Sequence, residues 1–213
     1  MDNITIIDYG LGNILSVERG FEYFGVKVVL TSDKEEIRNA SKLVLPGVGA
    51  FSVAMAELNS LGFTSVIKEV AKKGTPILGI CLGMQMLLDE SEEFGLEKGL
   101  GLIPGRVVSI PNHRADGVEQ KIPHIGWNEI VVSDGCENWE SKILKGIKQK
   151  DSFYFVHSYM ALPENNKNCI ADCFYGGVKI SSVINNENIY GCQFHPEKSG
   201  EAGLAILKNF IQL

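Results

Sequence analysis

Cys81 stands at the centre of a pentapeptide with the spacing of a nucleophile elbow. Gly79 and Gly83 lie two residues before and two residues after it, and small residues at these positions allow a tight, strained turn that projects the central side chain. A strand should precede the turn and a helix should follow, whose first free N–H groups can stabilise a thiolate and an oxyanion. The motif predicts a cysteine nucleophile. The alternative is a buried structural cysteine at a strand-to-helix turn.

His195 is the best candidate for the base that such a thiol needs. Of the four histidines, it lies directly after an apolar strand predicted at residues 189–194, and it should project from the end of the sheet as Cys81 does. Glu197, two residues further on, can accept a hydrogen bond from the imidazole and stabilise the imidazolium. Cys81, His195 and Glu197 therefore have the three roles of a triad, although His-Pro-Glu is also compatible with a polar turn.

A glycine-rich loop at residues 46–49 (Pro-Gly-Val-Gly) follows a predicted strand at the same sheet edge. Two glycines around Val48 allow a peptide to rotate and present an N–H near Val48 and Gly49. Together with the N–H of Leu82, this would form an oxyanion hole with two donors. The alternative is an ordinary strand-to-helix loop.

The elements that position these residues indicate an α/β fold, a mostly parallel sheet flanked by helices with a β-rich second half. Strands that are apolar throughout and alternate with helices are typical of parallel sheets with both faces covered, where ligands bind at the carboxyl ends of the strands. In the first half we expect strands at residues 3–8, 27–30, 42–45 and 76–80 and helices at 14–24, 52–61, 64–73 and 82–88.

The second half should consist mainly of short strands, and we expect residues 1–213 to form one domain. A hairpin turn is predicted at residues 185–188, and a last helix at 201–211 has Ser199 as its predicted N-cap. The predicted strands cover residues 106–110, 129–132, 152–156, 170–175, 179–184 and 189–194.

Composition excludes several functional classes. The 213 residues carry a net charge of -6 with no concentration of basic residues, which argues against nucleic acid and anionic membranes as partners. No apolar run approaches the roughly 20 residues of a membrane helix. Five cysteines form an odd set that suits a reducing compartment, so we expect a cytoplasmic protein with a thiol available for chemistry.

Two further patterns suggest cofactor sites, and both are incomplete. Residues 10–15 (Gly-Leu-Gly-Asn-Ile-Leu) follow a strand as a dinucleotide-binding loop would, with Asp33 near the end of the next strand, but Leu15 replaces the third glycine. Cys169 and Cys173 have a spacing that zinc could use, but no second pair of ligands lies nearby in the sequence, so core cysteines are expected. We predict no cofactor and no metal.

The glycine loop, the cysteine elbow and the His-Pro-Glu segment, in this order, resemble the class I (triad) glutamine amidotransferases. In that family a Cys-His-Glu triad hydrolyses glutamine and passes ammonia on. The resemblance is greatest to the glutaminase subunits of imidazole glycerol phosphate synthases, which serve histidine biosynthesis. The similar segments extend from Ile6 to Leu204 and read IIDYGLGN, LPGVGAF, GICLGMQMLLDESEE, GLGLIPGRV, IPHIGWNEI, FYFVHSY and GCQFHPEKSGEAGL.

The resemblance implies a set of residues that hold glutamine and a set that face a partner. Gln85 lies one helical turn beyond Cys81, within reach of a bound amide, whereas Glu93 ends an acidic run that is more typical of a solvated face. His124 and His157 match family positions, and we expect them to be structural histidines. The implied glutamine-binding residues are Gly47, Gln85, Glu93, Ser158 and Tyr159, and the implied partner-facing residues are Trp127 and Lys198.

The partner implied by the resemblance is a (β/α)₈ cyclase subunit that uses the ammonia. Such a barrel needs about 250 further residues, so we expect a separate subunit in a heterodimer. The polar segment between Pro111 and Pro123 departs from the usual pattern and could border that partner or its acceptor. Other interpretations are a subunit that supplies ammonia for the amination of a surface sugar, a stand-alone cysteine hydrolase, and a non-catalytic binding subunit, which an intact triad disfavours.

Overall fold

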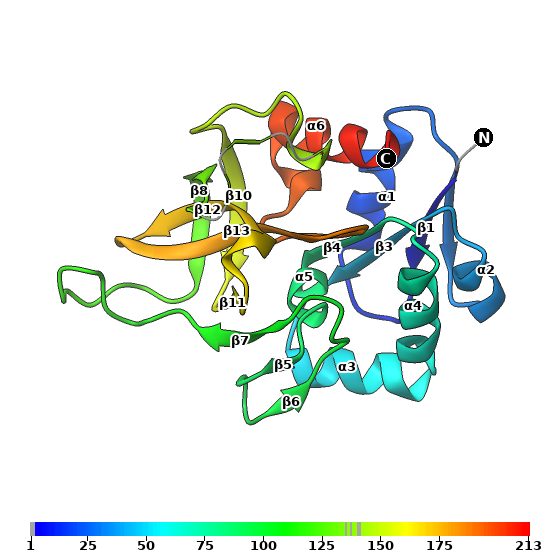
Figure 1. Cartoon of the computed structure of the whole chain (residues 1–213), viewed down its shortest axis with the longest axis horizontal. Coiled ribbons are helices and arrows are strands. Elements are labelled where there is room, and N and C mark those ends of the chain that lie inside the picture. Colours follow the sequence, from blue (N-terminus) through cyan, green and yellow to red (C-terminus); the bar gives the residue numbers. More distant parts are fainter. Residues whose placement is uncertain (1–2, 135, 137, 140–141) are drawn as a thin grey trace.

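A mixed eight-stranded sheet forms the centre of the molecule (Figure 1). The computed structural model describes residues 3–213 except 135, 137, 140 and 141. The strand order is β2-β1-β3-β4-β14-β13-β12-β9, and the first five strands are parallel. These five are β2 (Val28–Thr31), β1 (Ile4–Ile7), β3 (Lys42–Gly47), β4 (Ile77–Cys81) and β14 (Ile189–Cys192); the antiparallel strands are β13 (Val178–Asn186), β12 (Cys169–Tyr175) and β9 (Val131–Val132).

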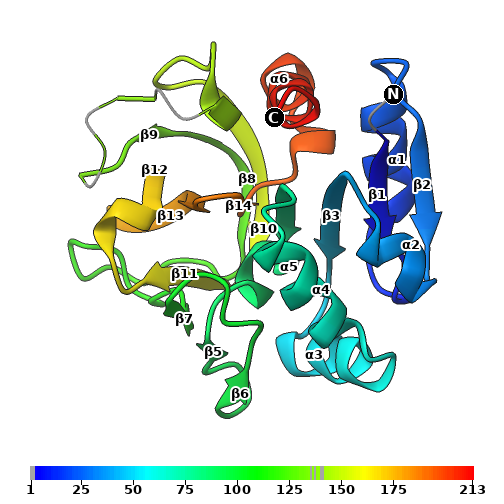
Figure 2. The same ribbon diagram turned by 45° about the vertical axis from the view of Figure 1, so that its right-hand side comes forward.

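Alternate residues of the parallel strands point into two separate cores. In β3, Val44 belongs to the core under helices α1 and α6, whereas Leu43 and Leu45 belong to the core under α2, α3 and α4. Figure 2 shows α6 and α3 on opposite sides of the strands. The helices are α1 (Ile14–Glu22), α2 (Lys34–Arg38), α3 (Phe51–Ser60), α4 (Phe63–Lys72) and α6 (Gly200–Ile211). The expected parallel sheet with two covered faces is therefore confirmed.

The second half is rich in strands, as predicted, but these strands belong to three sheets. Besides the antiparallel part of the main sheet, there is a two-stranded sheet and a four-stranded sheet in the order β11-β7-β5-β6. The two-stranded sheet pairs β8 (His124–Glu129) with β10 (Ser152–His157). The other strands are β11 (Tyr159–Pro163), β7 (Gly105–Ser109), β5 (Glu90–Ser91) and β6 (Glu97–Lys98), and short 3₁₀ turns are η1 (Lys142–Leu144), η2 (Asn166–Asn168) and η3 (Pro196–Lys198).

Several expected elements differ from those observed. The predicted strand 129–132 is two strands, because β8 ends at Glu129 and β9 begins at Val131. The helix expected at 82–88 is α5 (Leu82–Met86), only five residues long. The hairpin at 185–188 is confirmed by the antiparallel pairing of β13 with β14. Among the described residues, no helix is long and apolar enough to cross a membrane.

Ser199 occupies the N-cap position of α6, but its side chain makes no capping hydrogen bond. The hydroxyl instead donates to the carbonyl oxygen of His195 at 2.6 Å and accepts the backbone N–H of Tyr154 at 2.9 Å. The predicted capping role is therefore wrong. Ser199 joins the start of α6 to the segment that carries the candidate base.

Candidate active site

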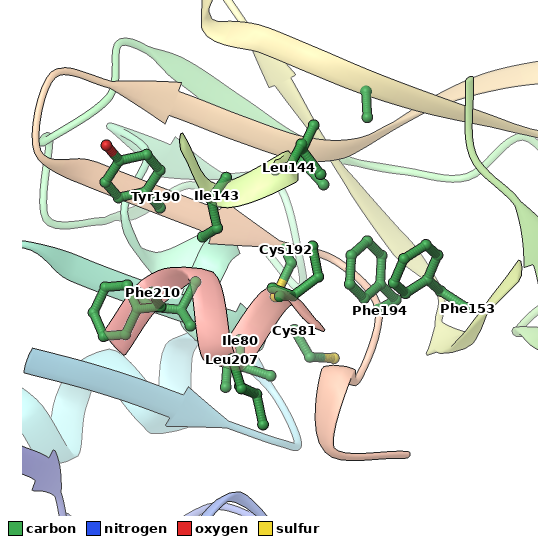
Figure 3. Packing of buried hydrophobic residues seen from close by; sticks show 14 of the residues in the cluster. Ile80, Cys81, Ile143, Leu144, Phe153, Tyr190, Cys192, Phe194, Leu207 and Phe210 are labelled. Atoms are coloured by element: carbon green, nitrogen blue, oxygen red, sulfur yellow. The ribbon is translucent and has the colours of Figure 1, made fainter. Parts of the chain in front are cut away.

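Cys81 is the last residue of β4 and has a strained backbone, with φ +56° and ψ -111°. A side chain at Gly83 would overlap the carbonyl oxygen of Leu45, and a Cβ at Gly79 would lie 2.7 Å from the backbone of Gly83. The glycines are therefore needed because β3, β4 and α5 approach closely at this turn, and the strain at Cys81 persists because this packing holds it. In Figure 3, Cys81 lies close to Ile80 and Leu207 of the packed core.

His195, three residues beyond the end of β14, is held against Glu197. Its Nδ1 lies 2.8 Å from Oε1 of Glu197, and both side chains are buried. Asn13, from the loop before α1, donates its side-chain N–H to the same Oε1 at 3.2 Å. Phe194, between Gln193 and His195, points the other way and stacks on Phe153 in the core, as Figure 3 shows. Because neighbouring side chains of an extended segment point to opposite sides, the imidazole of His195 points away from this core and toward Cys81.

Opposing effects act on the proton affinity of His195. Burial lowers the pKa of the imidazole, but the hydrogen bond to Glu197 and the proximity of Cys81 and Glu197 outweigh it and raise the pKa to about 9. The buried Nε2 of His195 has no hydrogen-bond partner among the described residues. Cys81 raises the pKa of the ring because its sulfur lies nearby. At neutral pH this raised pKa keeps the imidazole of His195 largely protonated.

Both reacting groups open into a pocket of about 540 Å³ at the carboxyl ends of β3 and β4. The pocket brings together most of the residues predicted for the site. It also includes four that the prediction had not placed there: Phe94, Pro123, Val156 and His157. The predicted residues among its lining are Cys81, His195, Val48, Gly49, Leu82, Gln85, Glu93, Ser158, Tyr159 and Lys198.

The glycine loop lies at the edge of this pocket, and its first two residues, Pro46 and Gly47, are the end of β3. Val48 and Gly49 line the pocket, and Gly49 has φ +95°. Gly47 does not line it: a Cβ there would lie 2.9 Å from the N of Gly83 and from the hydroxyl of Tyr9. Gly47 therefore packs against the elbow, and its contact with glutamine stays a prediction. Tyr9, whose pKa burial raises above its usual range, donates to the carbonyl oxygen of Pro46 at 2.8 Å and secures the loop.

Glu93 is buried, so the alternative interpretation of its acidic run as a solvated face is wrong at this position. Its Oε2 accepts the backbone N–H of Phe51 at 2.7 Å, which satisfies the first free N–H of α3. Ser91, also buried, accepts the backbone N–H of Glu93 at 3.1 Å. The fold of the short strand β5 turns this carboxylate inward, where it lines the pocket.

Gln85 lies in the pocket wall, where its amide orientation is determined by its neighbours. Its Nε2 donates to the carbonyl oxygen of Tyr159 at 3.0 Å and to Oε1 of Gln193 at 3.0 Å. Both amide protons are therefore used, and Oε1 is the atom left for a ligand.

His124 and His157 form a buried hydrogen-bonded pair, which confirms the expectation of satisfied structural histidines. Nδ1 of His124 lies 3.0 Å from Nε2 of His157, whose Nδ1 lies 2.8 Å from the carbonyl oxygen of Tyr159. That carbonyl can only accept, so Nδ1 of His157 carries a proton and Nε2 accepts from His124. Burial lowers the pKa of each imidazole to about 4, so both are neutral at pH 7.

The two residues predicted to face a partner are both exposed. Lys198 lies at the pocket edge, next to the turn that carries Glu197. Trp127 lies outside the pocket lining on β8, where its side chain is 59% exposed and that of Ile125 is 58% exposed. An exposed apolar strand face beside a pocket supports the prediction of a partner surface there.

The two partial cofactor motifs have other roles. Asn13, from the loop at residues 10–15 after β1, contacts Glu197. Asn13 was not predicted for the site, although it lies within a segment similar to the family. Cys169 and Cys173 are buried, and burial raises the pKa of each thiol to about 12, as suits core cysteines. The described part of the chain contains no group of three or more His, Cys, Asp or Glu side chains that could hold a metal ion.

Replacing Glu197 by glutamine is expected to lower the rate of Cys81 chemistry by about 10²- to 10⁴-fold, because the imidazole loses its charged partner. The loss of this negative charge also lowers the pKa of His195 from about 9, so the high-pH limit of activity should move to lower pH. A pH-rate profile measures both effects. Glu22→Gln, at the exposed end of α1, is the control, and an unchanged profile in Glu197→Gln would remove Glu197 from the triad.

Comparisons with known proteins agree with this geometry. Residues 5–213 match the family described as glutamine amidotransferase class-I. The chain is 56% identical over 213 residues to imidazole glycerol phosphate synthase subunit HisH 1 of Legionella pneumophila (strain Lens), with all of both chains covered. It is 45% identical to subunit HisH of Geobacillus sp. (strain WCH70), covering 99% of this chain and 96% of that one.

Solved structures support the fold. The structure of PurLQS from Thermotoga maritima matches 99% of this chain and 98% of its own with a TM-score of 0.73 at 17% identity. The glutaminase domain of CTPS from Trypanosoma brucei, solved with bound acivicin, matches all of this chain and 94% of its own with a TM-score of 0.66 at 15% identity. The arrangement of sheet and helices is therefore shared with proteins of very different sequence.

Proposed function

The chain belongs to the class I glutamine amidotransferases, and on this premise we propose that it is the glutaminase subunit of an imidazole glycerol phosphate synthase in histidine biosynthesis. Residues 1–213 form one amidotransferase domain in this proposal. The observation that carries the chemistry is the strained Cys81 beside His195, which is oriented by Glu197. The names and full-length similarity of the HisH relatives support the pathway.

In the proposed reaction, the Cys81 thiolate attacks the side-chain amide carbon of glutamine. The oxyanion that forms accepts hydrogen bonds from N–H groups near Val48 and Gly49 and from Leu82. The His195 imidazolium donates its proton to the departing nitrogen, and ammonia leaves as the tetrahedral intermediate collapses to a γ-glutamyl thioester. Neutral His195 then takes a proton from water, whose oxygen attacks the thioester; glutamate leaves and the Cys81 thiolate and His195 imidazolium are restored.

Glutamine would be held by Gln85, Glu93, Ser158 and Tyr159, all of which line the pocket. The available Oε1 of Gln85 suits an N–H donor of the substrate. The carboxylate of Glu93 suits the α-ammonium group, because the backbone N–H of Phe51 occupies Oε2 and leaves Oε1 as a second acceptor. Ser158 lies at the junction of β10 and β11, where its hydroxyl can contact the polar end of the substrate.

The proposed partner is a (β/α)₈ cyclase subunit that contacts Trp127 and Lys198 and receives ammonia along a shielded path. There the ammonia would enter a phosphoribosyl formimino intermediate, giving imidazole glycerol phosphate and an aminoimidazole carboxamide ribotide. Cytoplasmic location is part of the proposal, since all five cysteines are free thiols, as is usual in a reducing compartment.

Nitrogen labelling tests the proposed transfer directly. The complex with the cyclase subunit is supplied with acceptor, amide-¹⁵N glutamine and an excess of unlabelled ammonium, and the imidazole product is analysed by mass spectrometry. We expect the product to keep most of the ¹⁵N, because ammonia passes between the sites without mixing with the solvent pool. Complete dilution of the label, or no product from glutamine, would contradict the assignment.

A further inference from the structure

Gln193 is a buried polar residue to which no sequence motif gave a role. It follows β14 and has no exposed surface. Its Nε2 lies 3.8 Å from Sγ of Cys81, within the distance of a hydrogen bond to sulfur, and its Oε1 accepts from Nε2 of Gln85 at 3.0 Å. A fully buried carboxamide that contacts a candidate nucleophile requires a physical explanation.

The orientation of this carboxamide follows from an unambiguous acceptor. The carbonyl oxygen of Tyr159 can only accept, so Gln85 must present Nε2 to it. The second proton on this Nε2 then meets Gln193, which must present Oε1. Consequently, the NH₂ group of Gln193 faces Sγ of Cys81. The reverse orientation would place two donors against each other.

The backbone supports the same orientation. Gln193 and His195 are two residues apart on an extended segment, so their side chains lie on the same side, while Phe194 packs into the core between them. The backbone N–H of Gln193 donates to the carbonyl oxygen of Ser182 at 2.9 Å, and that of His195 donates to the carbonyl oxygen of Tyr154 at 2.9 Å. The backbones of Gln193 and His195, whose side chains face the sulfur, are therefore both fixed by hydrogen bonds in the segment that follows β14.

The sulfur of Cys81 also contacts a backbone carbonyl. Sγ lies 3.9 Å from the carbonyl oxygen of Val156, to which an S–H can donate but which repels a thiolate. A donor to sulfur on the other side offsets this effect, because hydrogen bonds to the charged form stabilise it. Among the described residues, the titratable groups that interact with Cys81 or line its pocket are His195, Tyr9, Cys192, Glu93, His157, Tyr159 and Lys198, and Glu197 acts on His195.

We propose that Gln193 stabilises the thiolate of Cys81 by donating a side-chain N–H to Sγ, in an orientation set by Gln85 and the Tyr159 carbonyl. This inference rests on the proposed function and adds a residue to it. Gln193 supplements the imidazolium of His195 and makes the nucleophile available before glutamine binds. It also connects the nucleophile to the pocket wall, since Gln85 contacts both Gln193 and the strand that carries Tyr159.

The test measures the reactivity of the thiol rather than turnover, so that its failure is distinguishable from failure of the proposed function. The rate at which iodoacetamide alkylates Cys81 is followed by peptide mass spectrometry from pH 5 to 10. In Gln193→Met, which keeps the length of the side chain without a donor, we expect the pKa of Cys81 to rise by about one unit. Alkylation at lower pH should then slow by about tenfold.

Gln193→Glu separates the contact with sulfur from the contact with Gln85. It keeps an acceptor for Gln85 but turns a carboxylate oxygen toward Sγ, so at pH 8 it should be alkylated more slowly than Gln193→Met. Thermal unfolding of each variant shows that the fold is retained. An unchanged pKa in Gln193→Met, or a rate in Gln193→Glu equal to that of the original protein, would overturn the proposal.

Discussion

Replacing Cys81 by alanine is expected to abolish glutamine-dependent synthesis while ammonia-dependent synthesis by the complex with the cyclase subunit remains. Only the thiol forms the γ-glutamyl intermediate in the proposed mechanism, and its removal should lower glutamine turnover by about 10⁴-fold or more. Ammonia added to the solution bypasses this step. The measurement compares product formation from glutamine with that from ammonium chloride at the same acceptor concentration.

The fold should tolerate this change, because alanine is smaller than cysteine and has the same Cβ at a position where the packing already holds a residue other than glycine at φ +56°. Cys136→Ala is the matched control, since Cys136 is half-buried and does not line the pocket. The control should keep both activities. Glutamine-dependent turnover in Cys81→Ala would exclude Cys81 as the nucleophile, whereas loss of both activities would contradict a role confined to the glutaminase step.

The second large effect concerns stimulation by the partner. We expect the isolated chain to hydrolyse glutamine poorly and its kcat to rise by a few hundredfold when cyclase and acceptor are bound. Removal of one oxyanion donor costs about 3 to 4 kcal/mol, which is enough for a change of this size. Rotation of the peptide between Val48 and Gly49 could supply or withdraw that donor. The effect should appear mainly in kcat, because the donor acts on charge that develops after binding.

Gly49→Ala tests whether this peptide is the switch. In the isolated chain Gly49 has φ +95°, and half a turn of the peptide takes φ to negative values that alanine prefers. A Cβ at Gly49 meets no atom within 4 Å, so the substitution acts through the backbone. We expect the unstimulated kcat to rise by about tenfold, because alanine disfavours the resting orientation by about 1 to 2 kcal/mol.

Gly74→Ala is a close control for this variant. Gly74 follows α4, has φ +82° and likewise has open space around a Cβ, so the substitution adds similar strain away from the pocket. Steady-state glutaminase assays on the chain alone, with cyclase, and with cyclase plus acceptor measure how far the partner and the acceptor raise kcat. Full activity in the isolated chain would contradict both the switch and the assignment to a two-subunit synthase, and an unchanged unstimulated rate in Gly49→Ala would exclude this peptide.

Much of the parallel part of the fold was predictable because its signals are local. The buried strands β1, β3 and β4 are continuous apolar runs, and the glycines around Cys81 mark a turn whose packing leaves no room for a Cβ. Strand β8 was missed because its hydrophobicity does not follow its burial. The burial alternates along the strand, but the inward positions carry His124, Gly126 and Asn128, whereas Ile125 and Trp127 are exposed. Short elements such as α2 and β5 depend on neighbours that are distant in sequence.

The site was predictable where a residue type itself indicates chemistry and less so where a contact determines its role. The residue types and spacing around Cys81, His195 and Glu197 predicted a triad. By contrast, the contact of Asn13 with Glu197 crosses 184 positions, and Glu93 is turned inward by a strand of two residues. One pattern could have indicated Gln193: it lies two residues before His195, so both side chains point to the same side of an extended segment. Its contact with the sulfur, however, depends on the neighbouring strand β4, which carries Cys81.

The most direct test of the proposed mechanism is covalent labelling by a glutamine analogue that carries a diazoketone in place of the side-chain amide. A nucleophile that attacks the amide carbon of glutamine should attack this analogue and retain it. Tryptic peptides are analysed by mass spectrometry after incubation with and without excess glutamine. The mechanism predicts one label per chain, on Cys81, slowed by glutamine and absent from Cys81→Ala. Labelling of another cysteine, or labelling that glutamine does not slow, would contradict it.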